Sequence, residues 1–521
     1  MSSTWTSPTG AYNAAVDMID RHVKEDRGAR VALIDPRTRL TYAELAARTN
    51  QFAHALPRLG IARERRIILI MLDTVDLPIV FWGAIKAGVA PAPINTLLTL
   101  EQWSYMIEDC RADAVVISAE LYDRAYTMLS EITARRHLHV IVTGSAPDQT
   151  TIGLDDLLAS SPTGAPLIET HADDVAFWLY SSGSTGMPKG TRHVQTSPMA
   201  TAKLYAQGVV GINESDVVFS AAKLFFAYGL GNGMSFPLSV GATAVLLPDR
   251  PTPDSVMGVM RAHNPTIFCG VPTLFASMLA HSELGKGAGS SRLRLCTSAG
   301  EALPEDVGRR FEEKVGVEII DGIGSTEMLH IFCSNRPGKV AYGTSGTPVP
   351  GYEARLLDDE GAPVPKGELG ELVIRGPSAA TDYWLQREKS RRTFRGEWTH
   401  TGDKYRIDDN GNYVYCGRTD DMFKVSGIWV SPFEVESALI THPAVLEAAV
   451  VGKEDTDGLI KPKAFVVLEP GFSNNEALYE ELKAHVKAAA GAWKYPRWVE
   501  ARAELPKTAT GKIQRFKLRT E

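Results

Sequence analysis

The chain has 521 residues, of which 44% are hydrophobic and 22% charged, and its formal net charge is -7. This length exceeds one ordinary hydrophobic core, so two or more domains are expected, and the composition excludes a disordered, fibrous or disulfide-stapled protein. The acidic balance gives no electrostatic reason to expect nucleic acid or an acidic membrane as a partner.

The cysteines and the N-terminus favour a cytoplasmic protein. The first ten residues, MSSTWTSPTG, lack the basic start and apolar block of a signal peptide, and the apolar run 77–85 is too short to span a bilayer. No CxxC pair or metal-ligand spacing occurs among the cysteines, so we expect buried thiols in a reducing compartment. The cysteines are Cys110, Cys269, Cys296, Cys333 and Cys416.

Helices and strands alternate along the first part of the chain. A capping-box pattern, Thr41 and Glu44, opens a predicted helix that stops near Gly60. The elements expected next are a buried strand at 67–72, a helix at 81–87 and an extended segment at 89–94. This alternation predicts an α/β domain whose strands are largely parallel.

Near its end, the sequence shows a charged segment followed by a new set of helix and strand signals. After the charged segment GRTDD (417–421), Ser431 is a predicted N-cap with Pro432 at the first helical position and Glu434 completing a capping box. Two β-rich runs and a helix bearing Leu478, Leu482 and Val486 follow. We therefore expect a large α/β N-terminal domain of several subdomains, residues 1–419, and a small mobile α+β domain, residues 420–521.

The segment YSSGSTGMPKG, residues 180–190, carries the strongest chemical signal. Small residues let the backbone approach a polyanion, while hydroxyls, N–H groups and one ammonium can turn toward phosphate oxygens. It is not a Walker A loop, because Pro188 and Gly190 stand where that motif needs Gly and Ser or Thr. The alternative is a flexible surface loop. The predicted phosphate-binding residues are Ser181, Ser182, Gly183, Ser184, Thr185, Gly186 and Lys189.

This segment resembles the signature loop of the adenylate-forming superfamily, which includes acyl-CoA synthetases, luciferases and adenylation domains. Further motifs resemble that superfamily in its usual order: SAGEALP (298–304), GSTE (324–327), TGD (401–403), GRTDD and PKTATGK (506–512). The resemblance covers the chain from about residue 175 to its end. It implies an enzyme that uses ATP with Mg²⁺ to activate a carboxylic acid as an acyl adenylate.

The resemblance also implies roles for residues on the nucleotide. Asp403 suits both ribose hydroxyls and Arg418 the same sugar, the alternative being a surface turn with an ordinary ion pair. Glu327 is the expected magnesium ligand, supported by Thr326, since magnesium takes hard oxygen ligands. Ile323 stands where most of the superfamily has an aromatic residue, so aromatic stacking on adenine is lost there. The residues implied on the adenine side are Gly300, Glu301, Ala302, Asp321, Gly322 and Ile323.

Lys512 is the expected catalytic cation. A carboxylate attacking the α-phosphate brings two anions together, and an ammonium that reaches both stabilises the transition state. The alternative is a solvated lysine on a basic tail, because Lys507, Arg515, Lys517 and Arg519 surround it. Acetylation would remove its charge, so a protein acetyltransferase and deacetylase acting on Lys512 are candidate partners.

The segments 221–232 and 324–332 resemble the subgroup of benzoate-CoA and 4-hydroxybenzoate-CoA ligases. Aromatic walls and a glycine floor suit a planar ring, so a small aromatic carboxylate is the expected substrate, with a cyclohexanecarboxylate or other cyclic acid as the alternative. Without the resemblance, the aromatic residues would be interpreted as part of the hydrophobic core. The residues implied around the ring are Phe226, Ala227, Tyr228, Gly324, His330 and Ile331.

The resemblance finally implies a second half-reaction with coenzyme A. The small domain turns about Asp420 as hinge and presents the segment 424–427, in which Lys424 and Gly427 meet the pantetheine arm. Rival hypotheses are a stand-alone enzyme that loads a carrier protein, a luciferase-like oxygenase and a non-catalytic binding relative. The sequence leaves the oligomeric state open, with a homodimer as one candidate.

Overall fold

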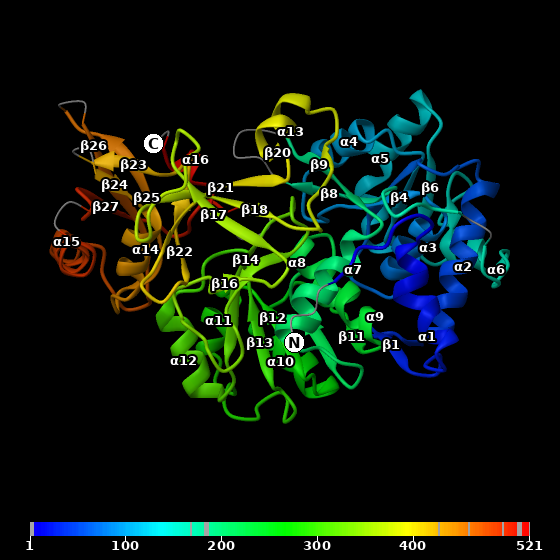
Figure 1. Ribbon diagram of the computed structural model, residues 1–521, viewed down its shortest axis with the longest axis horizontal. Coiled ribbons are helices and arrows are strands. Elements are labelled where there is room, and N and C mark those ends of the chain that lie inside the picture. The colour runs from blue at the N-terminus through cyan, green and yellow to red at the C-terminus, as the bar shows by residue number, and fades with distance from the viewer. Residues whose placement is uncertain are drawn as a thin grey trace.

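The computed structural model describes residues 5–166, 169–181, 187–425, 428–456, 459–491, 494–507 and 513–519. It confirms the expected α/β class, with the N-terminal half at the right of Figure 1 and the C-terminal part at the left. Among these residues, none of the helices combines the length and apolarity needed to cross a membrane.

A five-stranded sheet with only parallel pairings forms the first layer, and this confirms the expected parallel arrangement. Its strands in spatial order are β4 (Ala90–Pro93), β3 (Arg66–Ile70), β5 (Ala114–Ile117), β6 (His139–Val142) and β7 (Ile152–Gly153). Its accompanying helices are α2 (Tyr42–Arg58), α3 (Asp76–Lys86), α4 (Leu100–Asp109), α5 (Ala119–Arg135) and α6 (Leu154–Ala159).

Local signals fixed α2 but not α3. Thr41 and Glu44 form the predicted capping box, with the Thr41 side chain accepting from the Glu44 N–H and Glu44 accepting from the Thr41 N–H. Helix α3 begins at Asp76, five residues before the expected start at 81, and no side chain caps it. Every residue from Leu77 to Lys86 is buried, so the helix shows no polar face by which its start could be recognised.

A nine-stranded mixed sheet forms the second layer, with helices α10 (Pro253–His263), α11 (Pro272–Leu279) and α12 (Glu305–Val315) in its connections. The pairs from β14 to β1 are parallel, and β15, β16 and β2 add antiparallel edges. Its order is β16 (Thr347–Pro348), β15 (Ile331–Ser334), β14 (Ile319–Gly324), β13 (Leu295–Ser298), β12 (Ile267–Gly270), β10 (Val217–Ser220), β11 (Thr243–Val245), β1 (Val31–Ile34) and β2 (Arg39–Thr41).

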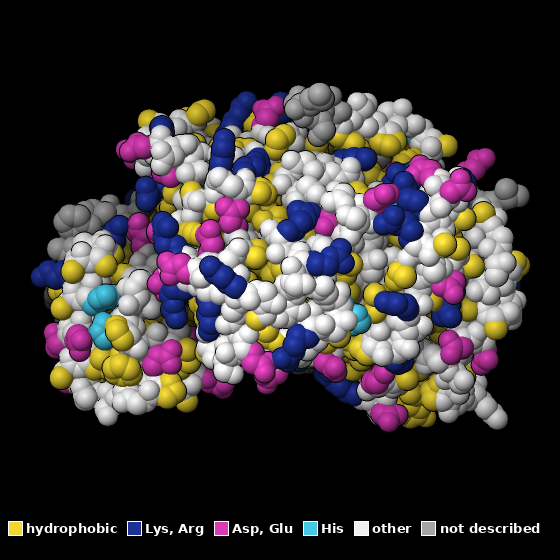
Figure 2. Space-filling view, turned by 90° about the horizontal axis from the view of Figure 1, so that it is seen from below, with side chains coloured by type: hydrophobic (Ala, Val, Ile, Leu, Met, Phe, Trp, Pro, Cys, Tyr) yellow, Lys and Arg dark blue, Asp and Glu magenta, His cyan; other side chains and the backbone are white. Residues whose placement is uncertain are grey.

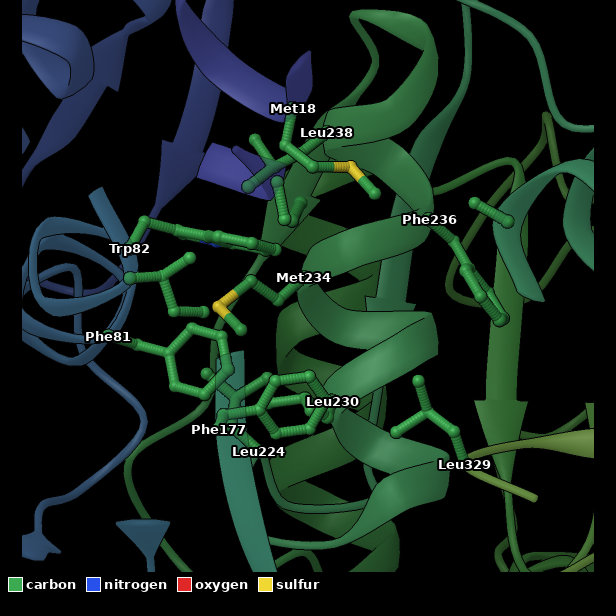
Figure 3. Close-up of a cluster of buried hydrophobic side chains, with 14 of the residues drawn as sticks. Met18, Phe81, Trp82, Phe177, Leu224, Leu230, Met234, Phe236, Leu238 and Leu329 are labelled. Atoms are coloured by element: carbon green, nitrogen blue, oxygen red, sulfur yellow. The ribbon is translucent and has the colours of Figure 1, made fainter. Parts of the chain in front are cut away.

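The two layers share one apolar core. Phe81 of α3 contacts Trp82 at 5.1 Å and Phe177 at 5.4 Å between ring centroids. In Figure 3 these rings face Leu230 and Met234, which come from the helical stretch made of α8 (Ala227–Leu230), the π-helix η3 (Gly231–Ser235) and α9 (Phe236–Val240). The helical stretch that carries two of the predicted acid-binding residues, Ala227 and Tyr228, is therefore embedded in the largest core.

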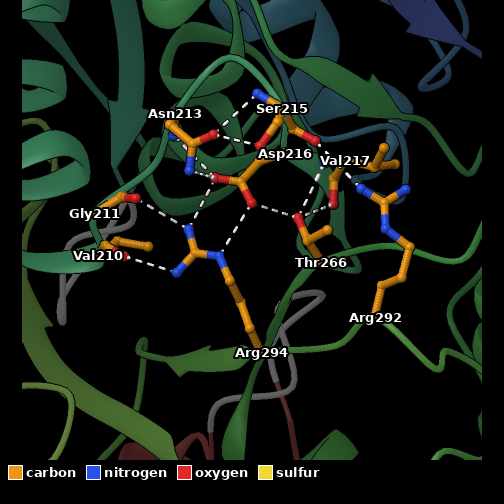
Figure 4. A network of polar contacts seen from close by, with 9 residues as sticks. All are labelled: Val210, Gly211, Asn213, Ser215, Asp216, Val217, Thr266, Arg292 and Arg294. Atoms are coloured by element: carbon orange, nitrogen blue, oxygen red, sulfur yellow. Dashed lines mark hydrogen bonds and ion pairs between the residues drawn. The ribbon is translucent and has the colours of Figure 1, made fainter.

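An ion pair between the buried Asp216 and the exposed Arg294 supports the start of β10. Asp216 accepts from Arg294 Nε at 3.0 Å and Nη2 at 2.8 Å, from Thr266 Oγ1 at 2.6 Å and from the Asn213 N–H at 2.9 Å (Figure 4). Burial alone would raise the pKa of Asp216, but these donors outweigh it and the pKa is lowered. The charged carboxylate is thus the form that the fold stabilises.

Two smaller sheets precede the C-terminal part in the chain. The three-stranded sheet is β19 (Asp382–Tyr383), β9 (Lys189–Val194) and β8 (Val175–Ser181). The second contains β17 (Glu353–Leu357), β18 (Gly370–Arg375), β20 (Phe394–Arg395), β21 (Trp398–Ile407) and β22 (Tyr413–Arg418), with α13 (Arg387–Thr393) nearby. Short helices complete this region: α7 (Ser197–Thr201) and the π-helix η2 (Ala202–Val210), with η1 (Val16–Asp20) and α1 (Arg21–Lys24) at the N-terminus.

The C-terminal part has its own core, made of buried residues from Phe423 onward. Leu478, Leu482 and Val486 of α15 are buried in it, as their spacing predicts. Ser431 caps α14 by accepting from the Glu434 N–H, as predicted. The Glu434 carboxylate does not complete the capping box but binds Lys494 at 2.7 Å. Its elements are β23 (Phe423–Val425), β24 (Ile428–Val430), α14 (Pro432–Ile440), β25 (Val445–Glu454), β26 (Ile460–Leu468), α15 (Glu476–Ala490), β27 (Trp498–Ala501) and α16 (Arg515–Arg519).

All five cysteines are free and buried, as expected. On the surface, Lys and Arg side chains are interspersed with Asp and Glu over the face shown in Figure 2.

Candidate active site

Lys189 begins β9, the strand that returns from the predicted phosphate loop. Strand β8 pairs antiparallel with β9, with Ser181 opposite Lys189, so the loop joins two neighbouring strands. Predicted residues Ser182, Gly183, Ser184, Thr185 and Gly186 lie outside the described residues. Burial lowers the pKa of Lys189, and the charge of Glu327 opposes that shift.

Glu327 follows β14 in a turn that is tied to β9. The Tyr383 hydroxyl donates to Glu327 Oε1 at 2.6 Å, and the Ala380 N–H donates to the Glu327 carbonyl at 2.7 Å. His193 of β9 donates from Nε2 to the Thr326 carbonyl at 2.8 Å. Both residues of the predicted magnesium motif are therefore fixed to the strand that carries Lys189.

Asp403 and Arg418, the residues predicted to bind the ribose, face each other across the β21–β22 pair. Arg418 Nη1 lies 3.1 Å from Asp403 Oδ1 and donates to the Thr401 carbonyl at 3.1 Å. Asp403 raises the pKa of Arg418, and Glu327 adds to that effect. Arg418 also lowers the pKa of Lys189. Lys189, Glu327, Asp403 and Arg418 are therefore close enough to interact electrostatically.

The predicted adenine side lies where two parallel strands end. Gly300, Glu301 and Ala302 follow β13, whose Ser298 pairs with Asp321 of β14. Burial raises the pKa of Asp321 to about 8, and the Leu303 N–H donates to its Oδ2 at 3.4 Å. At neutral pH this carboxyl is therefore mostly protonated, and it joins the ends of the two strands.

The predicted acid-binding residues meet between α8 and the start of β15. The Tyr228 hydroxyl contacts Thr297 Oγ1 at 2.7 Å, and His330 Nε2 donates to the Tyr228 carbonyl at 3.2 Å. Burial lowers the pKa of His330 to about 3, so the ring is neutral. Since Nε2 carries the hydrogen, Nδ1 is an acceptor, and it has no hydrogen-bond partner within the described part of the chain.

Two glycines allow the tight packing around His330. A Cβ on Gly324 would lie 2.6 Å from the His330 carbonyl oxygen, because Gly324 pairs with Ile331 across β14 and β15. A Cβ on Gly231 would lie 2.4 Å from His330 Cδ2. Phe226 and Ala227 stay partly exposed beside these packed residues, while Ile331 is buried.

The predicted hinge and thiol residues lie beyond the ribose site. Asp420 and Lys424 are exposed, Lys424 within β23, whereas Gly427 lies outside the described residues. Lys512 does too. The lysine motif is bracketed by a bridge between Lys507 and Ile513. Asp421 binds Arg515 at 3.6 Å and Arg519, so α16 is held beside the predicted hinge.

Three residues of this region, Tyr383, His193 and Phe236, were not predicted from the sequence. Tyr383 and His193 fix the magnesium motif, and the Phe236 ring lies 4.4 Å from the His330 ring between centroids. Each contact joins residues far apart in the chain, so no local pattern could indicate them.

Residues 19–384 match the family model described as AMP-binding enzyme, and residues 434–512 match the AMP-binding enzyme C-terminal domain. The chain belongs to the AMP-binding enzyme family. Its members include a benzoate–CoA ligase of Thauera aromatica, 57% identical over 98% of this chain and 96% of the relative. A 4-hydroxybenzoate–CoA/benzoate–CoA ligase of Rhodopseudomonas palustris is 52% identical over 98% of this chain and 94% of the relative.

Solved structures of AMP-binding enzymes agree with the fold. The crystal structure of a benzoate CoA ligase from Burkholderia xenovorans LB400 matches with a TM-score of 0.90 and 52% identity, over 98% of this chain and 100% of that one. This similarity supports the expected assignment to the adenylate-forming superfamily and to its subgroup of benzoate and hydroxybenzoate ligases.

Proposed function

We propose that this AMP-binding enzyme joins an aromatic carboxylic acid, benzoate or a hydroxybenzoate, to coenzyme A, converting ATP to AMP and pyrophosphate. The observation that carries the proposal is that Lys189 and Glu327 both contact Tyr383 and interact with the charge of Arg418, the partner of Asp403. The neutral His330 packs against Tyr228, Phe236 and Gly324 at the end of β14. The names of relatives that match nearly the whole chain support the aryl acid and the thiol.

The first step forms an acyl adenylate. A carboxylate oxygen bonds to the α-phosphorus of ATP as the bond from that phosphorus to its bridging oxygen breaks, and pyrophosphate leaves. Lys189 and the loop 181–186 would hold phosphate oxygens, and Asp403 with Arg418 the ribose. Lys512, from the C-terminal part, would neutralise the two anions as they meet.

The residues present fit a magnesium ion bound with ATP. Such an ion takes one or two protein carboxylates, with phosphates and waters completing its shell. Glu327 and the Thr326 hydroxyl offer hard oxygen donors, and the Glu327 carboxylate is fixed by Tyr383 beside Lys189. The ion would supply charge neutralisation for the phosphates.

The second step transfers the acyl group to sulfur. The coenzyme A thiolate attacks the acyl carbon, and AMP leaves. We propose that residues 420–521 turn about Asp420, withdraw Lys512 and bring Lys424 and Gly427 to the pantetheine arm. The separate core of the C-terminal part supports such a movement of one body.

The chemistry of His330 favours an acid with a plain or hydroxylated ring. A neutral imidazole whose Nε2–H is already bound to Tyr228 cannot pair with the substrate carboxylate. Its Nδ1 can only accept a hydrogen bond, for example from a hydroxyl group on the ring of the substrate. Phe226 and Tyr228 supply aromatic faces near it, with the Tyr228 and His330 centroids 5.6 Å apart.

The free, buried thiols support a reducing compartment, the cytoplasm. Acetylation of Lys512 by a protein acetyltransferase, reversed by a deacetylase, would switch the first step off. Mass spectrometry of protein isolated from cells tests this, and a lysine that is never modified would refute it.

The deciding experiment measures pyrophosphate release with a panel of aryl, alicyclic and short aliphatic acids, with and without coenzyme A. We expect release with benzoate or a hydroxybenzoate at lower concentration than with cyclohexanecarboxylate or acetate, and an aryl thioester once coenzyme A is present. Release with no thioester would favour a carrier-protein acceptor, and the absence of acid-dependent release would refute the proposal.

A further inference from the structure

Residues 378–384 form a strap between the two motif segments of the site. Ser378 Oγ donates to the Met328 carbonyl at 2.7 Å, and the Ala380 N–H donates to the Glu327 carbonyl at 2.7 Å. On its other side, the Trp384 N–H donates to the Gly190 carbonyl at 2.8 Å. The strap therefore connects the turn that carries Glu327 with the strand that begins at Lys189.

One side chain of the strap touches both charged groups. The Tyr383 hydroxyl donates to Glu327 Oε1 at 2.6 Å, and Lys189 Nζ lies over the same ring, 4.0 Å from its centroid. The ring thus lies between an anion and a cation that both face ATP in the proposed function.

The strap is anchored independently of these contacts. Asp382 accepts from Arg192 Nε and Nη2, each at 2.6 Å, in a bidentate pair. Trp384 Nε1 donates to the Asp109 carbonyl at 2.9 Å and its ring lies 5.0 Å from that of Trp178. With neighbours on both sides fixed, the Tyr383 ring has little freedom to move.

We propose that Tyr383 is a positioning residue for the first half-reaction. Its hydroxyl fixes one oxygen of the Glu327 carboxylate, so that the other oxygen is directed toward magnesium-bound ATP. Its ring holds the Lys189 ammonium in position to bind phosphate. The proposal rests on the proposed role of Glu327 as magnesium ligand. Partners that orient a metal ligand typically change metal affinity or activity by about 10–100-fold when removed.

The test separates the hydroxyl from the ring. Tyr383→Phe keeps the face that Lys189 contacts and removes only the donor, so ATP affinity measured by calorimetry in EDTA should equal that of the wild type. With Mg²⁺ present, the gain in ATP affinity should fall about tenfold, and the Mg²⁺ concentration for half-maximal pyrophosphate release should rise by a similar factor. Tyr383→Leu should weaken ATP binding in EDTA as well.

Tyr352→Phe is the matched control. Its hydroxyl is buried and contacts the strap at Ser378 Oγ, 2.7 Å away, but does not contact Glu327. It should leave the Mg²⁺ dependence at the wild-type value. An equal Mg²⁺ dependence for Tyr383→Phe and Tyr352→Phe would overturn the proposal.

Two further variants test whether the effect of Tyr383 acts through Glu327 and depends on its hydrogen-bond donor. In a Glu327→Gln background, Tyr383→Phe should have no additional effect on Mg²⁺-dependent ATP binding, and an undiminished effect would contradict the proposal. If Tyr383→Phe does not fold, Tyr383→His retains a ring N–H donor and should keep more Mg²⁺ dependence than Tyr383→Leu. Because ATP binding needs no acid, a wild type that binds Mg²⁺ and ATP without releasing pyrophosphate refutes the proposed function alone.

Discussion

Arg418 Nη1 lies 3.1 Å from Asp403 Oδ1 across the β21–β22 pair, two residues before the predicted hinge at Asp420. The pair ties the proposed ribose site to the segment that leads into the C-terminal part. A nucleotide that binds these side chains therefore acts on the residues about which the movement is proposed.

Replacing Asp403 with Asn should raise the KM for ATP about tenfold, with a smaller change in the KM for the acid. The neutral amide weakens charge-assisted bonds to Arg418 and the ribose, each worth roughly 1.5–3 kcal/mol. Steady-state pyrophosphate release at varied ATP measures the effect. Glu353→Gln is the control, because its carboxylate pairs with the partly exposed Arg375 and not with Arg418. Equal effects of the two variants would contradict the ribose assignment.

Replacing Lys512 with Ala should slow adenylate formation by roughly 10²-fold or more, the scale of losing one electrostatic contact in a transition state. Thioester formation from supplied acyl adenylate should persist, because the proposed movement has withdrawn the lysine by then. Single-turnover assays of each half-reaction measure both rates. Lys507→Ala, in the same motif and paired with Glu447 at 2.5 Å, is the control. Equal losses in both steps would contradict the role.

The fold could be predicted largely because its strongest determinants are local. The capping box at Thr41 and the apolar periodicity of α15 act within a few residues, and both are present as expected. The start of α3 could not be predicted, because tertiary packing buries every residue from Leu77 to Lys86. The fold also requires a glycine at position 324, because a Cβ there would lie 2.6 Å from the His330 carbonyl oxygen, and this long-range contact could not be predicted from the sequence.

The candidate site was predicted only where motifs carry it. Asp403 and Arg418 lie 15 residues apart and meet because their strands are neighbours in the sheet. Tyr383 lies 56 residues from Glu327, and nothing near it in the sequence indicates the contact. Residues that are proposed to act on the substrate were thus easier to predict than the residues that hold them in place.

Asp321 and Asp216 should respond to pH in opposite directions. Asp321 has a raised pKa of about 8, so between about pH 4 and 8 the folded protein keeps a proton that the unfolded chain has lost, and stability falls as pH rises. Asp321→Asn removes this loss. The difference in Tm between the variant and wild type, measured without ATP, should therefore shift in favour of the variant from pH 5 to pH 8.

Asp216→Asn gives the contrasting case. The lowered pKa of Asp216 stabilises the folded protein above the unfolded value near 4, and this stabilisation is lost as pH falls through the folded pKa. The Tm penalty of the variant should be full at pH 7 and smaller near pH 3. A Tm difference for either variant that does not change with pH would contradict its assigned charge state.

A single methyl group at Gly231 should disturb the proposed acid pocket. The added Cβ would lie 2.4 Å from His330 Cδ2 and 2.9 Å from the Phe236 ring, and both rings are buried, so they can yield little. Overpacking of this kind costs about 1–3 kcal/mol. Gly231→Ala should lower the Tm and raise the KM for benzoate by about tenfold, because His330 and the Tyr228 carbonyl that it holds must shift.

Gly258→Ala supplies the matched control, since Gly258 lies within α10 and a Cβ there would meet nothing within 4 Å. Removing a glycine from a helix at such a place should stabilise the protein by about 0.5–1 kcal/mol and leave the KM for benzoate unchanged. Thermal unfolding and pyrophosphate release at varied benzoate measure both variants. If Gly231→Ala lowers the Tm but leaves the KM at the wild-type value, the packing around His330 is structural and the acid lies elsewhere.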